Sequence, residues 1–322
     1  MQPAVEVTGG PIVNYKLSSL RNLFRRDAGG GGSIYEHIRS HVRPDGPGLT
    51  EGGMKLPDES DRDDAWFWGA GVKDGIASHH MGAGPSDDRV DEIFDLINRA
   101  GWRGGGEIQE LEDVLATIEA SSIVDPLLDR LRASQISAQE LETLGRNLAK
   151  TSSYRSAVKI GIAMLGTVAT RRNRDLITML GRHDEFTLYS AVALSNTEAD
   201  PEGALWELAK LVGGWGRIHL VERLRTTTRP EIQEWILRGG FRNSVMDEYL
   251  AYIAATTGGL TRALDVDDPD DELLNAACDI VRALIQGGLL RISTTILTRA
   301  SRSSAWSATS RIALRRSITS WP

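Results

Sequence analysis

The sequence predicts an all-α protein, with an irregular array of helices behind a loop-rich N-terminal segment. From about residue 90 onward, apolar residues recur at spacings of three and four, which is the period of one helix face. No hairpin dipeptide separates alternating apolar runs, so we expect no strand there. Residues 1–89 hold 15 of the 33 glycines and 6 of the 11 prolines, a density that interrupts regular structure repeatedly.

The clearest helix of the N-terminal segment is predicted at Ser33–Val42. Ser33 and Glu36 have the spacing of a capping box, and Pro44 lies just beyond the helix end. The four glycines at 29–32 predict a flexible joint before this helix. We divide the chain into a Gly/Pro-rich cap segment, 1–89, a helical array, 90–288, and a C-terminal segment, 289–322.

The array is predicted to run helix after helix. Apolar-periodic stretches cover residues 89–100, 107–120, 123–134, 137–150 and 154–169. Ser137 and Glu140 have the spacing of a second capping box. Pro126 lies near a helix start, where its missing N–H costs least.

Part of the array repeats. LVGGWGRIHLVERL, residues 211–224, aligns with LRGGFRNSVMDEYL, residues 237–250, through a leucine, a Gly-Gly pair and an aromatic residue. Residues 180–192 align with the first copy through their Leu-Gly and two later apolar positions. We expect each helix to end at a glycine with positive φ, after which the next helix packs back. Units of this size stack as an α-solenoid.

The stretch LITMLGRHDEFTLYSAVAL, residues 176–194, resembles a HEAT-type repeat, with a leucine-rich first helix, a Leu-Gly end and an acidic turn. The resemblance covers about residues 90–288. The cap segment, with YEHIRSHVRPDGPGLTEGG and AWFWGAGVKDGIASHHMG, is similar to bacterial proteins that carry such helical arrays. The resemblance implies an irregular HEAT-like α-solenoid with a loop-rich N-terminal cap, and it implies no particular activity.

Charge and composition narrow the function classes. A formal net charge of −7 disfavours a dedicated nucleic-acid binder, which needs a dense Lys/Arg surface. Cys278 is the one cysteine, so an intrachain disulfide and a multi-thiolate metal site are both excluded. We see no signal pattern and no apolar run near the ~20 residues that span a bilayer. We therefore expect a cytoplasmic protein without a membrane segment.

The C-terminal segment differs from the rest of the chain. The 43 residues after Asp279 carry seven arginines and no acidic residue. The preceding part of the chain therefore holds 30 basic and 44 acidic residues, a net charge of −14. Residues 289–322 also lack the recurring Leu-Gly pattern of the array. This composition fits a basic arm for an acidic partner or nucleic acid, or a sequence shifted out of its reading frame. We expect a poorly ordered basic tail.

Four of the six histidines lie close together in the sequence, which suggests a metal site. His37 and His41 are four residues apart on the capped helix, a spacing that one metal ion can bridge. If the turn with His79 and His80 folds back onto that helix, these nitrogens and the Asp74 carboxylate would bind zinc or iron and activate water. This hypothesis is a metal-dependent hydrolase or oxygenase with Asp74, His79 and His80 as catalytic candidates.

The same residues also fit a structural turn with no cofactor, which we favour. HIRSH lacks the glutamate of the H-E-x-x-H metalloprotease motif. Adjacent histidines on an extended segment point to opposite sides, so both rarely bind one ion. Asp74 is suited to cap a short helix, and Gly75 and Gly82 provide backbone freedom for a tight turn.

Aromatic residues form the second candidate site. Trp66, Phe67 and Trp68 stand together before the glycine-rich turn, and Trp66 and Trp68 are the predicted binding residues. Exposed tryptophans on a solenoid stack on nucleobases in HEAT-like DNA glycosylases. Trp215 and Phe241 instead follow Gly-Gly pairs in two copies of the repeat. This position predicts packing plugs, by which we mean large buried rings that fill the space left by the glycines.

Charged runs give no specific signal. Residues 58–66 and 265–272 are acidic stretches. The second lacks the glycine and the terminal glutamate of an EF-hand and is predicted to be a solvated loop leading into a helix N-terminus. Arg171, Arg172 and Arg174 form a small basic patch on a predicted loop.

The sequence therefore predicts a non-catalytic binding or scaffold protein that recognises a protein or peptide partner on a helical-repeat surface. One alternative is a metal-dependent enzyme with a His/Asp site where cap and array meet. The other is a HEAT-like nucleic-acid or damaged-base binder.

Overall fold

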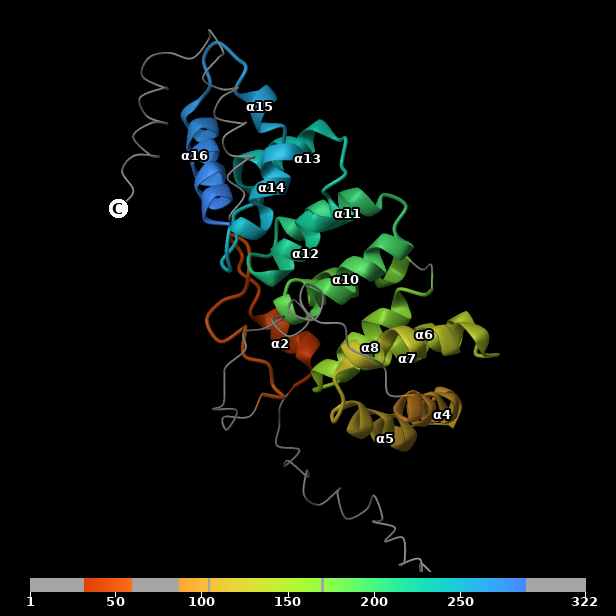
Figure 1. Ribbon diagram of the computed structural model, residues 1–322. Coiled ribbons are helices and arrows are strands. Elements are labelled where there is room, and N and C mark those ends of the chain that lie inside the picture. The colour runs from red at the N-terminus through yellow and green to blue at the C-terminus, as the bar shows by residue number, and fades with distance from the viewer. Residues whose placement is uncertain (1–31, 60–86, 104, 169–170, 288–322) are drawn as a thin grey trace, which may run out of the picture. The chain divides into compact units, whose positions relative to one another are not determined.

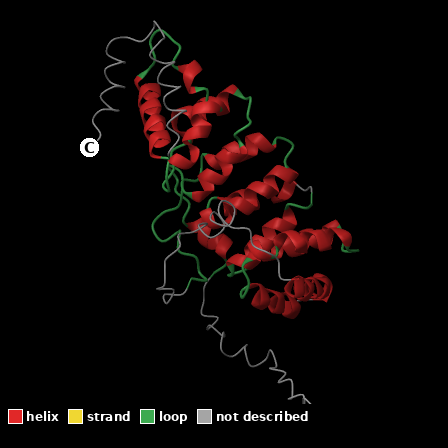
Figure 2. Cartoon of the chain, in the orientation of Figure 1, coloured by secondary structure: helices red, strands yellow, loops and turns green. Residues whose placement is uncertain are grey.

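The computed structural model describes residues 32–59, 87–103, 105–168 and 171–287. The chain divides into two compact units, 1–31 and 32–322, and every described residue belongs to the second. Regular structure in the described ranges is helical, without a strand, and one isolated bridge joins Val42 and Leu49 (Figure 2). The all-α prediction is therefore confirmed for these ranges. The predicted tail, 289–322, lies outside them, and the domain boundary at residue 89 stays a prediction.

The predicted capped helix is present as α2, Ile34–Ser40, although it is shorter than expected. Ser33 Oγ accepts a hydrogen bond from the Glu36 N–H at 3.2 Å. Ile34 and Ile38, one turn apart on the same face, are fully buried, and α2 packs on α7 (Ala138–Thr151) and α9 (Arg174–Gly181). The helix ends before Val42 because that residue turns into the bridge with Leu49.

The remaining helices follow in the order that the apolar period predicts (Figure 1). They are α4 (Asp87–Arg103), α5 (Gly105–Leu115), α6 (Val124–Ala133), α8 (Arg155–Leu165), α10 (Asp184–Thr197), α11 (Pro201–Ala209), α12 (Trp215–Arg223), α13 (Pro230–Trp235), α14 (Glu248–Thr256), α15 (Leu260–Ala263) and α16 (Asp271–Gln286). A π-helical turn, Ile236–Gly240, follows α13. The capping box of α7 is confirmed, because Ser137 and Glu140 exchange both hydrogen bonds. No helix within these ranges combines the length and apolar character that a bilayer span requires.

Alternate helices pack on one another in series. Helix α8 packs on α10, α10 on α12, α12 on α14, and α14 on α16. The intervening helices α9 and α11 each pack on the helix that follows them. Helices α10, α12 and α14 therefore each contact two alternate helices of this series, and α10 and α12 also contact the helix that precedes them in the sequence.

The glycines at the helix ends have a different role from the one predicted. Among the described glycines, only Gly48, Gly52 and Gly259 have positive φ, so the Gly-Gly pairs at 213–214 and 239–240 are not left-handed caps. A Cβ on Gly240 would lie 2.7 Å from the Trp235 ring, closer than real Cβ atoms approach. Small size, which allows close contact, is what the packing requires at this position.

The aromatic residues after these glycine pairs are buried, as the packing-plug prediction expects. Trp215 is 7% exposed and Phe241 is fully buried. The two aligned copies nevertheless differ in local structure: Trp215 begins helix α12, whereas Phe241 leads into the turn before α14. Sequence similarity between these copies therefore reflects a shared packing requirement at one position rather than identical helices.

Helices α7 and α8 cross at a glycine contact, where alanine should be destabilising. A Cβ on Gly161 would lie 2.7 Å from the backbone N of Ala149 and 2.8 Å from the carbonyl O of Gly145. We expect Gly161→Ala to lower the free energy of unfolding by about 2 kcal/mol, because neither backbone group can move freely away. Urea denaturation measures this. Gly213→Ala is the control, since a Cβ there meets nothing within 4 Å. Equal denaturation midpoints for the two variants would contradict the crossing geometry.

Candidate functional site

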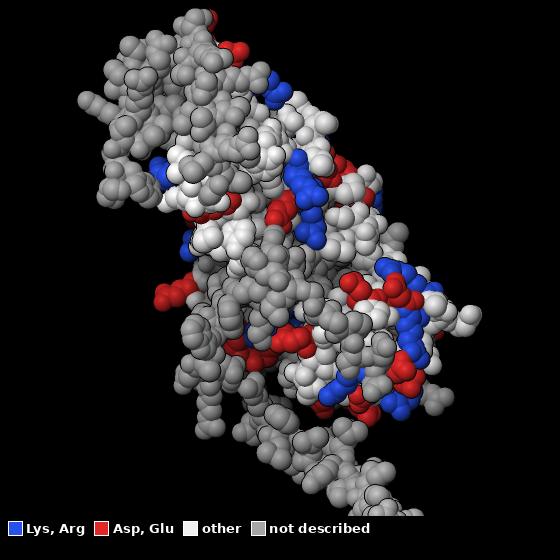
Figure 3. Space-filling view, in the orientation of Figure 1, with Lys and Arg blue, Asp and Glu red and all other residues white. Residues whose placement is uncertain are grey.

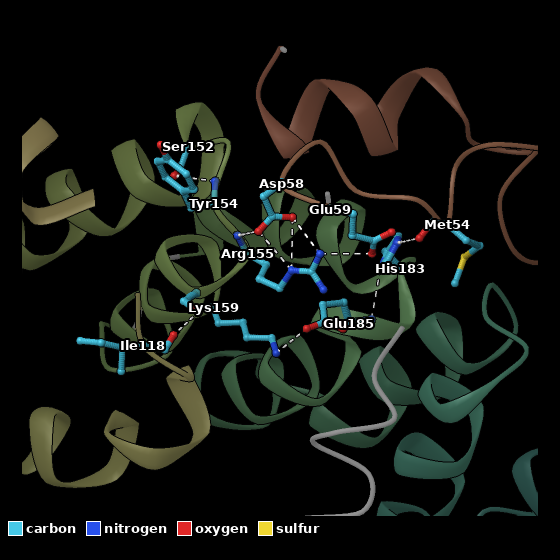
Figure 4. A network of polar contacts seen from close by, with 11 residues as sticks. Met54, Asp58, Glu59, Ile118, Ser152, Tyr154, Arg155, Lys159, His183 and Glu185 are labelled. Atoms are coloured by element: carbon cyan, nitrogen blue, oxygen red, sulfur yellow. Dashed lines mark hydrogen bonds and ion pairs between the residues drawn. The ribbon is translucent and has the colours of Figure 1, made fainter. Parts of the chain in front are cut away.

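Residues 54–59 of the cap segment contact α8 and α10 through buried and partly buried polar groups, a set that we call the junction (Figure 4). The junction consists of Asp58, Glu59, Arg155, Lys159, His183 and Glu185, together with the Met54 carbonyl. It is the place where cap and array meet, and it contains acids, bases and a histidine. Its chemistry depends on how each group is held.

Asp58 holds the N-terminus of α8. The N-cap residue, Tyr154, provides no side-chain hydrogen bond to this helix. Asp58 Oδ2 accepts instead from the Arg155 backbone N–H at 2.8 Å, and Asp58 Oδ1 accepts from Arg155 Nη2 at 2.9 Å. Glu59 Oε1 accepts from the same Nη2 at 3.1 Å. Because a helix N-terminus has unsatisfied N–H groups and a partial positive charge, a carboxylate placed here stabilises the helix from a distant segment.

Lys159 and Glu185 form a buried ion pair one turn further along α8. Lys159 Nζ lies 2.7 Å from Glu185 Oε1, and the two side chains are 3% and 10% exposed. The Lys159 ammonium also lies 5.4 Å from the centre of the Tyr189 ring. Burial of two charges is costly unless each one neutralises the other, so this pair joins α8 to α10.

His183 is the N-cap residue of α10, and it also contacts the N-terminal segment through Met54. Its Nδ1 accepts from the Glu185 N–H at 3.2 Å, so the proton is on Nε2, which lies 3.3 Å from the Met54 carbonyl O. Burial lowers the pKa of His183 to about 4, against the opposing charge of Glu185. The unfolded chain takes up a proton near pH 6.5. Stability is therefore full above that pH and falls as the pH decreases towards 4, by about 3 kcal/mol at most.

His37 and His41, the two predicted metal ligands in the described ranges, do lie together. Their ring centres are 4.4 Å apart. His41 Nδ1 contacts the His37 carbonyl O at 2.8 Å, and burial, followed by the charge of His41, lowers the pKa of His37. No three His, Cys, Asp or Glu side chains in the described part of the chain are arranged to hold a metal ion. Residues 60–86, which include the other predicted ligands and tryptophans, lie outside that part.

Asp184, next to the junction, caps α12 from α10. Its Oδ1 accepts from the Gly216 N–H at 3.2 Å. Burial raises the pKa of Asp184 to about 6, although the N–H groups of Gly216, Trp215 and Gly214 favour its ionised form. Because the folded-state pKa is above the unfolded one, near 3.8, the carboxyl group stabilises the fold most below that value. This contribution is lost as the pH rises through 6.

We expect Asp184→Asn to raise the free energy of unfolding by about 3 kcal/mol at pH 7.5, because the pKa of Asp184 rises from 3.8 to about 6 on folding and each pKa unit represents about 1.4 kcal/mol. The asparagine amide oxygen still accepts the N–H bonds of α12 but carries no charge to bury. At pH 4 the aspartate is itself neutral, so the difference should disappear. Urea denaturation at the two pH values measures both effects. A variant that is destabilised at pH 7.5 would show that the buried carboxylate is a net stabiliser.

A second group of polar side chains lines an open groove of about 390 Å³ beside α9 and α11, which we call the α9–α11 groove. Its charged and aromatic members are Arg171, Arg174, Glu198, Asp200, Trp206, Glu207 and Arg229. Figure 3 shows basic and acidic side chains intermingled on the face seen there, without a large patch of one sign. The groove is likewise a mixed-charge surface.

Most charged side chains that line this groove are paired within the described structure, whereas two buried atoms of lining residues have no hydrogen-bond partner there. Arg229 Nη1 donates to both carboxylate oxygens of Asp200, at 3.2 and 3.1 Å. Arg174 Nη1 lies 3.4 Å from Glu198 Oε2. Glu198 Oε1 and Trp206 Nε1 are buried without a hydrogen-bond partner. Both atoms are inaccessible to solvent, so the accessible surface of the groove is formed by the charged side chains around them.

Sequence reasoning placed the candidate site at the cap–array boundary but missed the residues that form the junction. Asp58 and Glu59 belong to the acidic run that carried no specific signal, yet both bind Arg155. Of the arginine patch, Arg172 pairs with Glu142 and Arg174 with Glu198, and both arginine side chains remain largely exposed, as predicted. Comparison of the chain with known protein families, curated proteins and solved structures finds no match.

Proposed function

We propose that this chain is a non-catalytic binding protein that recognises a protein or peptide partner on the surface of a HEAT-like α-solenoid. The series of alternate helices from α8 to α16, each packed on the next, supports the solenoid part of the proposal. Stacked helix pairs offer extended surfaces with regularly spaced side chains, which suits recognition of another chain.

The observation that carries the proposal is the contrast between the junction and the α9–α11 groove. At the junction, Arg155, Lys159 and His183 all face groups that neutralise them or accept their protons. The groove, by contrast, is open and lined by side chains of both charges, among them Arg171, Arg174 and Asp200. Charged side chains at an open surface can pair with complementary charges of a partner chain. The junction therefore acts as a structural clamp, and the groove acts as a recognition surface.

Affinity purification of the tagged full chain tests this proposal. We expect one protein to co-purify and, once produced separately, to bind the chain saturably at a fixed stoichiometry in titration calorimetry. The variant His37→Ala/His41→Ala should bind it equally well, because both histidines lie outside the groove. Elemental analysis of the same samples provides the control for the enzyme alternative.

Three outcomes would contradict the proposal. One is stoichiometric zinc or iron in wild-type protein that is lost in His37→Ala/His41→Ala. The second is salt-sensitive retention on heparin with no protein partner, which favours nucleic acid. The third is the absence of any saturable protein or peptide binding by correctly folded chain.

A further inference from the structure

We propose that His183 makes the junction sensitive to acid: a proton on its ring releases residues 54–59 from α8 and α10, while the helical array stays folded. The change is local. It goes beyond the proposed function, because it concerns the state of the cap segment and not the choice of partner.

Both nitrogens of the His183 ring are in use, and only the neutral ring serves both contacts. Nδ1 accepts from the Glu185 N–H at 3.2 Å, and the Nε2–H donates to the Met54 carbonyl O at 3.3 Å. A protonated imidazole has two N–H donors and no acceptor. Its Nδ1–H would face the Glu185 N–H, which is a contact between two donors, on a ring that has no exposed surface. Protonation therefore disfavours the closed junction.

Residues 54–59 are the part of the junction that is able to move away. They lie in turns and loop rather than in a helix, and a few contacts hold them. Leu56 is 2% exposed, and the Asp58 carboxylate binds the first residue of α8. Because the Met54 carbonyl O contacts the Nε2 side of the His183 ring, release of these residues opens that nitrogen to water. Local openings of this kind need less free energy than unfolding of the core helices.

The charges at the junction do not compensate a buried imidazolium. Burial lowers the pKa of His183 most, Glu185 opposes this effect, and Arg155 and His37 add to it, so that the pKa is about 4. The charged and titratable groups of the elements packed here are Glu185 of α10, Arg155 and Lys159 of α8, His37 of α2, and Asp58 and Glu59 of the cap segment.

The two protonation equilibria set how far acid shifts the junction. In the open form the exposed ring titrates near its ordinary pKa of 6.5, whereas in the closed form it takes up a proton only near pH 4. The open form therefore binds more protons, so a decrease in pH favours it. Between pH 7.5 and pH 5 the ratio of open to closed junction should rise about 25-fold.

Asp184 acts in the opposite direction and keeps the next contact of the array intact. Burial raises the pKa of Asp184 to about 6, so its carboxyl group is mostly neutral at pH 5. Protonation of this group favours the folded state, and therefore the contact between α10 and α12 loses no stability at the pH at which the junction opens. This difference in sign separates release of residues 54–59 from general unfolding.

Amide hydrogen exchange of the full chain measures the opening, when it is followed by NMR and divided by the intrinsic exchange rate at each pH. We expect protection of the Arg155 and Glu185 N–H groups to fall about 25-fold between pH 7.5 and pH 5. The Gly216 N–H, which donates to Asp184, is the control and should change by less than about threefold. His183→Asn keeps an acceptor for the Glu185 N–H but does not titrate, so its protection should also change by less than about threefold.

A second measurement does not depend on a His183 variant. Asp58→Ala/Glu59→Ala removes the carboxylates that bind α8 and favours the open form, so the pKa of the His183 ring in an NMR titration should rise towards 6.5. Loss of two negative charges would by itself lower the pKa of a histidine, so a rise reports opening. Asp91→Ala, which breaks an exposed surface pair, is the matched control and should leave the pKa of His183 unchanged.

Four results would overturn the inference. The first is equal protection of the Arg155 and Glu185 N–H groups at pH 7.5 and pH 5. The second is an equal loss of protection at Gly216, which would mean general unfolding. The third is the full pH dependence in folded His183→Asn, which would assign the effect to another group. The fourth is an unchanged pKa of His183 in Asp58→Ala/Glu59→Ala.

Discussion

Replacing Lys159 by methionine should lower the free energy of unfolding by about 4 kcal/mol, because the substitution removes the ammonium that pairs with the buried Glu185 carboxylate. The Lys159 and Glu185 side chains are 3% and 10% exposed and their charged atoms are 2.7 Å apart. Water therefore cannot replace the lost ammonium without opening the contact between α8 and α10. Equilibrium denaturation in urea at pH 7.5 measures the loss.

A second substitution separates charge burial from packing. Lys159→Met combined with Glu185→Leu removes both charges and keeps most of the side-chain volume, so the double variant should recover at least about 2 kcal/mol of the loss. If the double variant is less stable than Lys159→Met, the carboxylate is solvated or bound elsewhere, and the ion pair does not join α8 to α10.

Arg155→Met should cost about 3 kcal/mol and release the end of the cap segment from α8. The variant removes the guanidinium that binds Asp58 and Glu59, which remain partly buried. We place the cost at the lower end of the range for buried pairs because the Arg155 side chain is 28% exposed. Hydrogen exchange should show faster exchange at residues 48–59 and at the first turn of α8.

The matched control for Arg155 is Arg130→Met. Arg130 pairs with Asp91 on the surface, with side chains 43% and 60% exposed, so its loss should change stability by less than about 1 kcal/mol. Similar losses for Arg155→Met and Arg130→Met would contradict the role of Arg155 as a clamp, as would unchanged exchange at residues 48–59.

The helices could be predicted from the sequence because their signals are local. Apolar period and the capping box of Ser137 and Glu140 depend on residues three or four positions apart, and both predictions are confirmed. The prediction of positive φ at the Gly-Gly pairs 213–214 and 239–240 was wrong. The sequence does not show whether a Gly-Gly pair is needed for a turn with positive φ or for close packing of a neighbouring side chain. Gly240 is an example of close packing, because the Trp235 ring lies against it.

The junction could not be predicted because its contacts are long-range. Asp58 and Arg155 are 97 residues apart, and nothing in the acidic run distinguishes Asp58 from aspartates that remain in solvent. Glu198 has an equally ordinary sequence context, and only its burial beside Arg174 marks it. Trp206 was recognisable as a tryptophan near a helix end, but its unpaired N–H is a property of the packed structure.

The most direct test of the account compares partner affinity across three proteins by titration calorimetry: wild type, the groove variant Arg171→Glu/Arg174→Gln, and the histidine variant His37→Ala/His41→Ala. If recognition takes place on the helical surface, the groove variant should bind at least about tenfold more weakly, while the histidine variant keeps wild-type affinity. The reverse pattern, full affinity in the groove variant and loss in the histidine variant, would place the working site at the cap and contradict the account.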